Sequence, residues 1–164
     1  MLNFYMKKIL PAAWCITCLP FLSFSQNGTS GGIFDLLASK NEPEITIRTD
    51  MDSLFAKKKT NEYIAGTMEI QQGKKEPPLL LPVKIKSRGK FRRMKCDFPP
   101  LKLKFKKDDL EKLGLNKYNE LKLVTHCLDD KNTSRDLILR EHLIYKLYNE
   151  LTPFSFRAHF IKVE

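Results

Sequence analysis

The chain has 164 residues, enough for one modest domain, and its 29 basic residues against 19 acidic ones give a net charge of +10. It contains no P-loop and no GxGxxG or HExxH motif. The enzyme classes that these motifs define are therefore excluded. A strongly basic chain instead favours anionic partners.

The first 25 residues have the three parts of a secretory signal. Lys7 and Lys8 form a positive start, an apolar run covers residues 9–24, and Ser23 and Ser25 are small residues suited to a cleavage site. We therefore predict a signal peptide over residues 1–25 and an exported protein, located in the periplasm, in the cell envelope or outside the cell.

The alternative is an uncleaved membrane anchor. Two prolines interrupt the apolar run, and the run is short compared with the roughly 20 residues of a membrane-spanning helix. No later segment is apolar enough to suggest a span, so we expect no transmembrane span in the mature chain. Loss of the two lysines with the signal would lower the net charge to about +8.

Two cysteines, Cys96 and Cys127, remain after the signal. In an oxidising compartment they could form one disulfide, and the alternative is a pair of buried thiols. Sequence spacing leaves both possibilities open. A zinc site that adds His126 and His142 has no CxxC or HxxxH spacing to support it, so we predict no metal site.

The order of elements predicts an α+β fold, with a mainly antiparallel sheet and one long helix near the C-terminus. A flexible leader is expected over residues 26–42, with a helical turn near residues 33–39, before a single domain over residues 43–164. Alternating or apolar runs predict strands at 44–49, 63–71, 79–86, 101–105, 121–125 and 156–163.

Two helices are predicted in the second half of the chain. The first is short and covers residues 108–113. The second begins at a capping box in residues 133–136 and ends before Pro153. Apolar residues at three- and four-residue spacings predict that Leu143, Ile144 and Leu147 form its buried stripe.

Basic residues are concentrated between Lys84 and Lys107, where eleven of them occur with one acid, Asp97. This density favours phosphates, acidic polymers or anionic headgroups as ligands. The alternative is the solvated face of ordinary strands. We expect no nucleic-acid partner, because neither aromatic stacking groups nor a groove-binding helix accompanies the charge.

A candidate functional loop follows the last buried strand before the long helix. It contains Asp129 and Asp130, and His126 is close enough in sequence to reach it. Functional residues are often placed on such loops. A plain turn is the alternative interpretation.

The second half of the chain resembles the N-terminal part of the spore-coat-H (CotH) kinase-like family over about residues 80–164. The motifs that carry the resemblance are Ser87-Arg88-Gly89, the lysine-rich strand Leu101 to Phe105, the strand Leu121 to His126, Asp129-Asp130, Leu139-Arg140 with the helix through Tyr145, and the segment Phe156 to Val163.

The resemblance implies an atypical kinase-like fold that acts on secreted or envelope proteins with ATP and a divalent metal. Lys102 and Lys104 are then the candidates for contact with nucleotide phosphates. Two departures matter: Phe98 and Pro99 occupy positions where the family usually has lysines, and the sequence ends at Glu164, where the family continues into its catalytic residues.

We therefore expect a truncated or degenerate relative, inactive by itself, with no cofactor of its own. Its partner would be an anionic ligand or a missing C-terminal segment. The alternative function is a small basic module that binds an anionic polymer or membrane surface.

Export gives the first testable prediction. N-terminal sequencing of the protein from the exported fraction should begin at Gln26, because cleavage is expected after Ser25. An intact Met1 or Met6 terminus on protein from the cytoplasmic fraction would contradict this.

Overall fold

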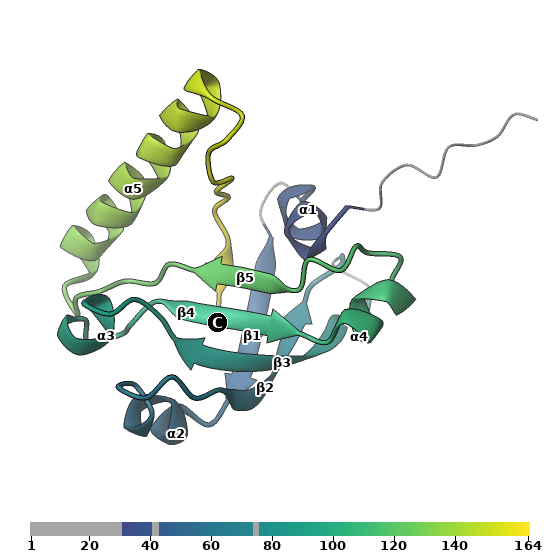
Figure 1. Ribbon diagram of the computed structural model, residues 1–164, viewed down its shortest axis with the longest axis horizontal. Helices are drawn as coiled ribbons and strands as arrows, with labels where there is room; N and C mark the ends of the chain where they lie inside the picture. Colours follow the sequence, from purple (N-terminus) through teal and green to yellow (C-terminus); the bar gives the residue numbers. More distant parts are fainter. Residues whose placement is uncertain (1–30, 41–42, 74–75) are drawn as a thin grey trace, which may run out of the picture.

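The computed structural model describes residues 31–40, 43–73 and 76–164 and has an α+β fold (Figure 1). Six strands form one curled sheet in the order β5-β4-β3-β2-β1-β6, and every neighbouring pair is antiparallel except β1 and β6. The predicted fold class, with its mainly antiparallel sheet and long C-terminal helix, is confirmed. The predicted signal peptide lies outside the described residues.

The strands are β1 (Glu44–Thr49), β2 (Ile64–Ile70), β3 (Leu79–Ser87), β4 (Leu101–Phe105), β5 (Glu120–Leu123) and β6 (Lys162–Val163). The helices are α1 (Ile33–Ala38), α2 (Met51–Ala56), α3 (Arg92–Lys95), α4 (Lys107–Lys112) and α5 (Lys131–Leu151).

Alternation along β3 and β4 builds the core. Val83 lies opposite Phe105 and Ile85 opposite Leu103, and all four side chains are buried. Side chains of adjacent strand residues point to opposite faces, so the lysines between these residues lie on the other side of the sheet. The same two strands therefore supply both the centre of the core and a basic surface.

Helix α1 requires a correction to the expected leader over residues 26–42. Ile33 and Leu37 lie one helical turn apart, and both are buried against the core cluster of the sheet. Two apolar residues at this spacing give even a six-residue helix a face to pack. This part of the sequence therefore belongs to the folded domain.

Helix α5 also differs from the prediction. The expected stripe of Leu143, Ile144 and Leu147 is exposed, with Leu147 at 55%. The helix projects from the sheet and returns through the segment after it (Figure 1). The side of α5 that makes contacts carries His142, whose ring lies 4.0 Å from that of Phe160 in the returning segment.

The last predicted strand, over residues 156–163, is much shorter in the structure. Only Lys162–Val163 pair, in parallel with β1, because the preceding residues cross from the end of α5 to the sheet. Backbone bonds of 2.9 Å from Lys162 N–H to the Pro43 carbonyl and from Glu164 N–H to the Ile45 carbonyl hold the chain end in place. Ile161 packs against the core beside them.

The contrast between core and helix gives the second prediction. Leu103→Ala should lower the free energy of unfolding by about 2–5 kcal/mol, because it removes a fully buried side chain. The matched change Leu147→Ala should cost no more than about 0.5 kcal/mol, because that side chain is half exposed. Urea denaturation measures both, and a larger loss for Leu147→Ala would show that α5 is covered.

Candidate functional site

A groove of about 700 Å³ lies where the loop after β5 meets α5 and the returning C-terminal segment. Two of the predicted residues, His126 and Asp129, line it. Ser134, Arg135, Ile138, Leu139 and Phe160 complete the lining. These five were missed as site residues because nothing in the sequence shows that α5 and the C-terminal segment meet at this loop.

His126 is held at the groove by an aromatic contact. Its ring stacks on that of Phe98 with centroids 5.2 Å apart and an angle of 19° between the planes. The neighbouring Thr125 hydroxyl donates to the Phe98 carbonyl at 3.2 Å. His126 is an exposed residue, so it can still meet a solute in the groove.

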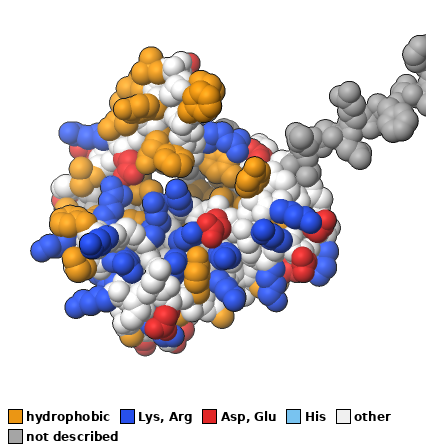
Figure 2. All heavy atoms as spheres, viewed as in Figure 1, with side chains coloured by type: hydrophobic (Ala, Val, Ile, Leu, Met, Phe, Trp, Pro, Cys, Tyr) orange, Lys and Arg blue, Asp and Glu red, His pale blue; other side chains and the backbone are white. Residues whose placement is uncertain are grey.

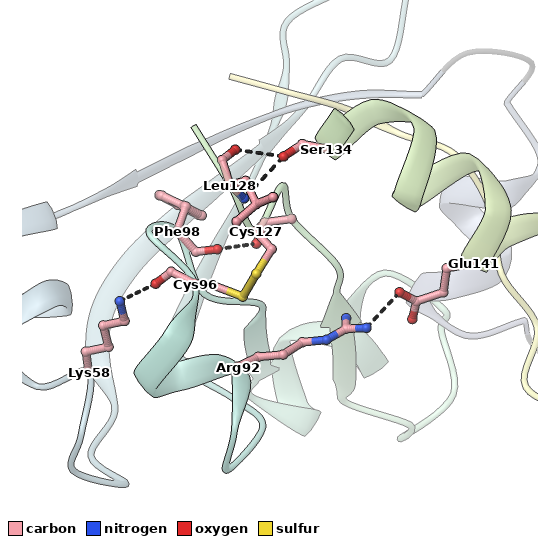
Figure 3. Close-up of a disulfide and its surroundings, with 9 residues drawn as sticks. Lys58, Arg92, Cys96, Phe98, Cys127, Leu128, Ser134 and Glu141 are labelled. Carbon is pink, nitrogen blue, oxygen red and sulfur yellow. Dashed lines mark hydrogen bonds and ion pairs between the residues drawn. A yellow bond between two sulfur atoms is a disulfide. The ribbon is translucent and has the colours of Figure 1, made fainter. Parts of the chain in front are cut away.

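A disulfide between Cys96 and Cys127 fixes the loop that carries His126 and Asp129 (Figure 3). The Asp97 N–H donates to the Cys127 carbonyl at 2.9 Å, and the Lys58 ammonium donates to the Cys96 carbonyl. Arg92 then reaches Glu141 of α5 at 3.1 Å. The sequence left the pairing of these cysteines open, and the structure pairs them.

Asp130 has a structural role and is not among the residues that line the groove. Its carboxylate accepts hydrogen bonds from the N–H groups of Asn132 and Thr133 and from the Thr133 hydroxyl. These bonds, the hydroxyl bond foremost, lower the pKa of Asp130 below its usual value of 3.8. Asp130 is therefore the N-cap of α5, and the predicted capping box at residues 133–136 is wrong by one helical turn.

Ser134 explains why the helix can begin earlier. Its hydroxyl donates to the Leu128 carbonyl at 2.7 Å and accepts from the Leu128 N–H at 3.2 Å. Both bonds go to the preceding loop, which closes against the first turn of α5. The groove therefore has a rigid end built from Leu128 to Ser134.

The second site is the outer face of β3, β4 and β5. We define the lysine face as Lys84, Lys86, Lys102, Lys104 and Lys122. Cross-strand pairing places Lys84 opposite Lys104, Lys86 opposite Lys102, and Lys102 opposite Lys122. The space-filling view shows many basic side chains gathered over these strands (Figure 2).

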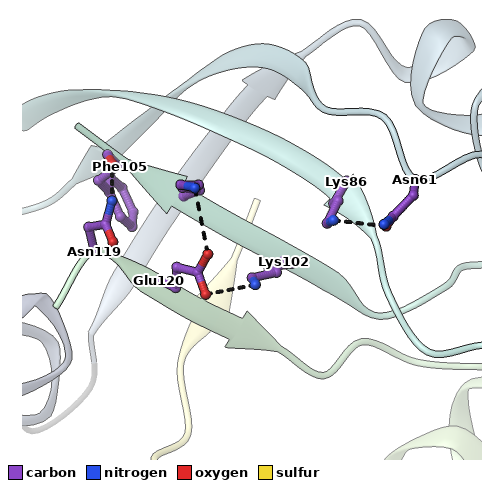
Figure 4. Close-up of polar contacts among 7 residues, drawn as sticks. Asn61, Lys86, Lys102, Phe105, Asn119 and Glu120 are labelled. Carbon is purple, nitrogen blue, oxygen red and sulfur yellow. Dashed lines mark hydrogen bonds and ion pairs between the residues drawn. The ribbon is translucent and has the colours of Figure 1, made fainter. Parts of the chain in front are cut away.

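One carboxylate, Glu120, lies within this face (Figure 4). It is 2.7 Å from the Lys102 ammonium and 4.0 Å from that of Lys104. The hydrogen bond to Lys102 lowers the pKa of Glu120, and the same bond raises the pKa of Lys102. Lys86 is held by the Asn61 side chain at 2.8 Å and lies over the Tyr63 ring.

The structure does not bring the two sets of predicted residues together. Among the described residues, those that line the groove with His126 and Asp129 include neither Lys102 nor Lys104. A smaller hollow of about 450 Å³ lies at Glu120 instead, lined by Lys107, Lys117, Tyr118 and Asn119 as well. The alternation Leu121-Lys122-Leu123 was the sequence signal that could have added Lys122 to the lysine face.

The described residues contain neither a metal-binding cluster nor a membrane-spanning helix. In residues 31–40, 43–73 and 76–164, no group of three or more histidine, cysteine or acidic side chains is placed to hold a metal ion. No helix within the same ranges combines the length and apolar character that crossing a membrane requires.

Comparison of the chain with protein-family models, with curated proteins and with solved structures found no match. The resemblance to the spore-coat-H kinase-like family therefore remains a prediction.

The third prediction concerns Asp130. Asp130→Ala should speed hydrogen exchange at the Asn132 and Thr133 amides, because the carboxylate that accepts from them is gone. Asp130→Asn keeps an acceptor and should leave exchange nearly unchanged. Because the pKa of Asp130 is lowered, the protection should persist above pH 3.8 and disappear as the pH falls through the lowered value. Equal exchange in both variants would refute the capping role.

Proposed function

We propose that this protein is an exported basic module that binds ligands carrying several negative charges through its lysine face. The single observation that carries the proposal is the cross-strand pairing of lysines on β3, β4 and β5. Five ammonium groups share the outer surface of β3, β4 and β5 with the one carboxylate that these three strands place there, Glu120.

The arrangement is electrostatically unfavourable without a ligand. Like charges directly opposite each other on neighbouring strands destabilise a sheet. Lys84 makes no hydrogen bond or ion pair with any described residue, and Lys104 has only the 4.0 Å contact with Glu120. An anionic ligand that spans the strands would relieve this repulsion and gain from several ammonium groups at once.

A structural feature also supports the export part of the proposal. The Cys96–Cys127 disulfide supports export, because disulfides persist in oxidising compartments. The lysine face needs only binding, so the proposal includes no catalytic activity for this chain alone. No cofactor is required for it.

A second candidate is nucleotide binding, as the family resemblance implies for Lys102 and Lys104. The hollow beside Glu120 favours it, because Lys107 and Lys117 add charge there and Tyr118 offers an exposed ring. Phosphates could then contact the lysines while the base lies on the tyrosine. In this candidate the ligand is small and occupies one end of the face.

The fourth prediction tests the lysine face with inorganic polyphosphate. Lys84→Gln together with Lys104→Gln should weaken binding by on the order of tenfold, because each basic residue near an anionic surface contributes about 1 kcal/mol. Lys59→Gln with Lys112→Gln removes the same charge from exposed sites outside the face and should change affinity by less than about threefold. Titration at two salt concentrations measures both variants.

The outcomes separate the candidates. Equal losses in the two variants would show a response to net charge alone and would overturn the lysine face as a site. If ATP with magnesium displaces polyphosphate at concentrations far below those at which a simple salt displaces it, the nucleotide candidate is favoured. Loss of polyphosphate binding only in the Lys84 and Lys104 variant supports the main proposal.

A further inference from the structure

The far end of α5 and the turn after it form an exposed apolar surface, which we call the tip. It consists of Leu147, Tyr148, Leu151, Phe154 and Phe156. Exposure rises toward the end of the helix, from 49% at Leu137 to 81% at Leu151 and 96% at Phe154. Figure 2 shows apolar side chains gathered on the projecting part of the molecule. Large contiguous apolar patches on a protein surface usually mark a place of interaction.

The shape of the tip suits a fluid partner. Its side chains stand outward from the end of a projecting helix, and the most exposed one, Phe154, lies in the turn beyond it. A pocket on another protein would have to match this shape in detail. An acyl-chain layer adapts to any convex apolar surface, and aromatic side chains favour its boundary with water.

Hydrogen bonds between side chains and backbone groups of the turn satisfy several of its polar atoms. The Asn149 amide donates to the carbonyls of Tyr145 and Phe156 at 2.8 and 3.3 Å, and the Ser155 hydroxyl donates to Asn149 Oδ1 at 2.6 Å. The Phe154 N–H donates to the Thr152 hydroxyl at 3.2 Å. Satisfied polar groups lower the cost of entering an apolar medium.

The charges around the tip fit anionic headgroups. The Lys122 ammonium of the lysine face lies 4.5 Å from the centre of the Phe156 ring, so the two surfaces are continuous. Lys146 is exposed on the helix one residue before the tip begins. Glu150, an exposed acid within the tip, is rotated around the helix by about 100° from Leu151 and by about 60° from Leu147, so its carboxylate can stay in the headgroup layer.

We propose that the tip inserts into the interfacial region of an anionic lipid bilayer while Lys122 and the adjoining lysine face contact the headgroups. The electrostatic part rests on the proposed function, and it assigns the anionic partner of the lysine face to a lipid surface. Insertion of the tip adds an apolar contact that no soluble polyanion could provide.

The experiment places one tryptophan reporter at the tip of the full-length chain. Trp14→Phe removes the natural tryptophan, and Phe154→Trp adds the reporter. The matched control is Phe55→Trp in the same background, because α2 lies at the opposite end of the molecule from the tip (Figure 1). Vesicles of phosphatidylcholine with about one third phosphatidylglycerol provide the anionic surface, and brominated acyl chains quench an inserted indole.

Insertion predicts a blue shift and strong bromolipid quenching for the Phe154→Trp reporter, with little change for the Phe55→Trp control. The blue shift and the quenching report only on the surroundings of the indole. A vesicle bound by another part of the chain would therefore not produce them. A second variant, Leu151→Ser with Phe154→Ser, should weaken vesicle binding by on the order of tenfold and leave polyphosphate binding unchanged.

Three results would overturn the inference. One is an unshifted, unquenched Phe154→Trp reporter in a chain that binds polyphosphate, which leaves the proposed function standing. Another is a shift that occurs without vesicles and rises with protein concentration, alongside oligomers in light scattering, because the tip would then be a contact between copies. Failure to bind both vesicles and polyphosphate would refute the proposed function as well.

Discussion

The register between β3 and β4 is the constraint on which the rest of the structure depends. It sets Val83 against Phe105 and Ile85 against Leu103 in the core, and in the same step it sets Lys84 against Lys104 and Lys86 against Lys102 outside. If either strand slipped by one residue, its two lysines would turn toward the core and its apolar side chains toward water, which a folded chain cannot tolerate. The basic surface is therefore fixed as firmly as the hydrophobic core, although Glu120 is the one carboxylate among the described residues that pairs with its lysines.

Local patterns predicted the elements whose partners are near in sequence or whose alternation is strict. Strands β1 to β5, α4 and the existence of α5 follow from side-chain period and turn residues. Gly66, which weakens β2 as a sequence pattern, fits because a Cβ there would lie 2.8 Å from the Arg48 carbonyl oxygen of β1. The buried face assigned to α5 was wrong, because three-residue spacing shows that a helix has an apolar side but not what covers it. The capping box failed for a related reason: Ser134 bonds to the preceding loop rather than to the helix.

The two candidate sites also differ in how far the sequence could predict them. The lysines of β3 and β4 could be placed on one surface from sequence, since alternation alone decides which side they occupy. The groove could only be anticipated at His126 and Asp129, because its other walls come from α5 and from Phe160, more than thirty positions after Asp129 in the chain. The disulfide between Cys96 and Cys127 needed the fold as well, since their Cα atoms come within 4.5 Å only after β4 and β5 have paired.

The parallel pairing of β6 with β1 has a consequence for how the chain reaches its native state. The Lys162 ammonium contacts the Glu44 carboxylate across 118 positions of sequence, and the backbone bonds beside it join the first strand to the last residues. Contacts of such long range form late and slow the folding of small domains. Until residues 162–164 emerge from the ribosome, the outer edge of β1 offers unpaired N–H and carbonyl groups to any other extended chain. A nascent chain that has not yet exposed these residues therefore cannot complete its six-stranded sheet.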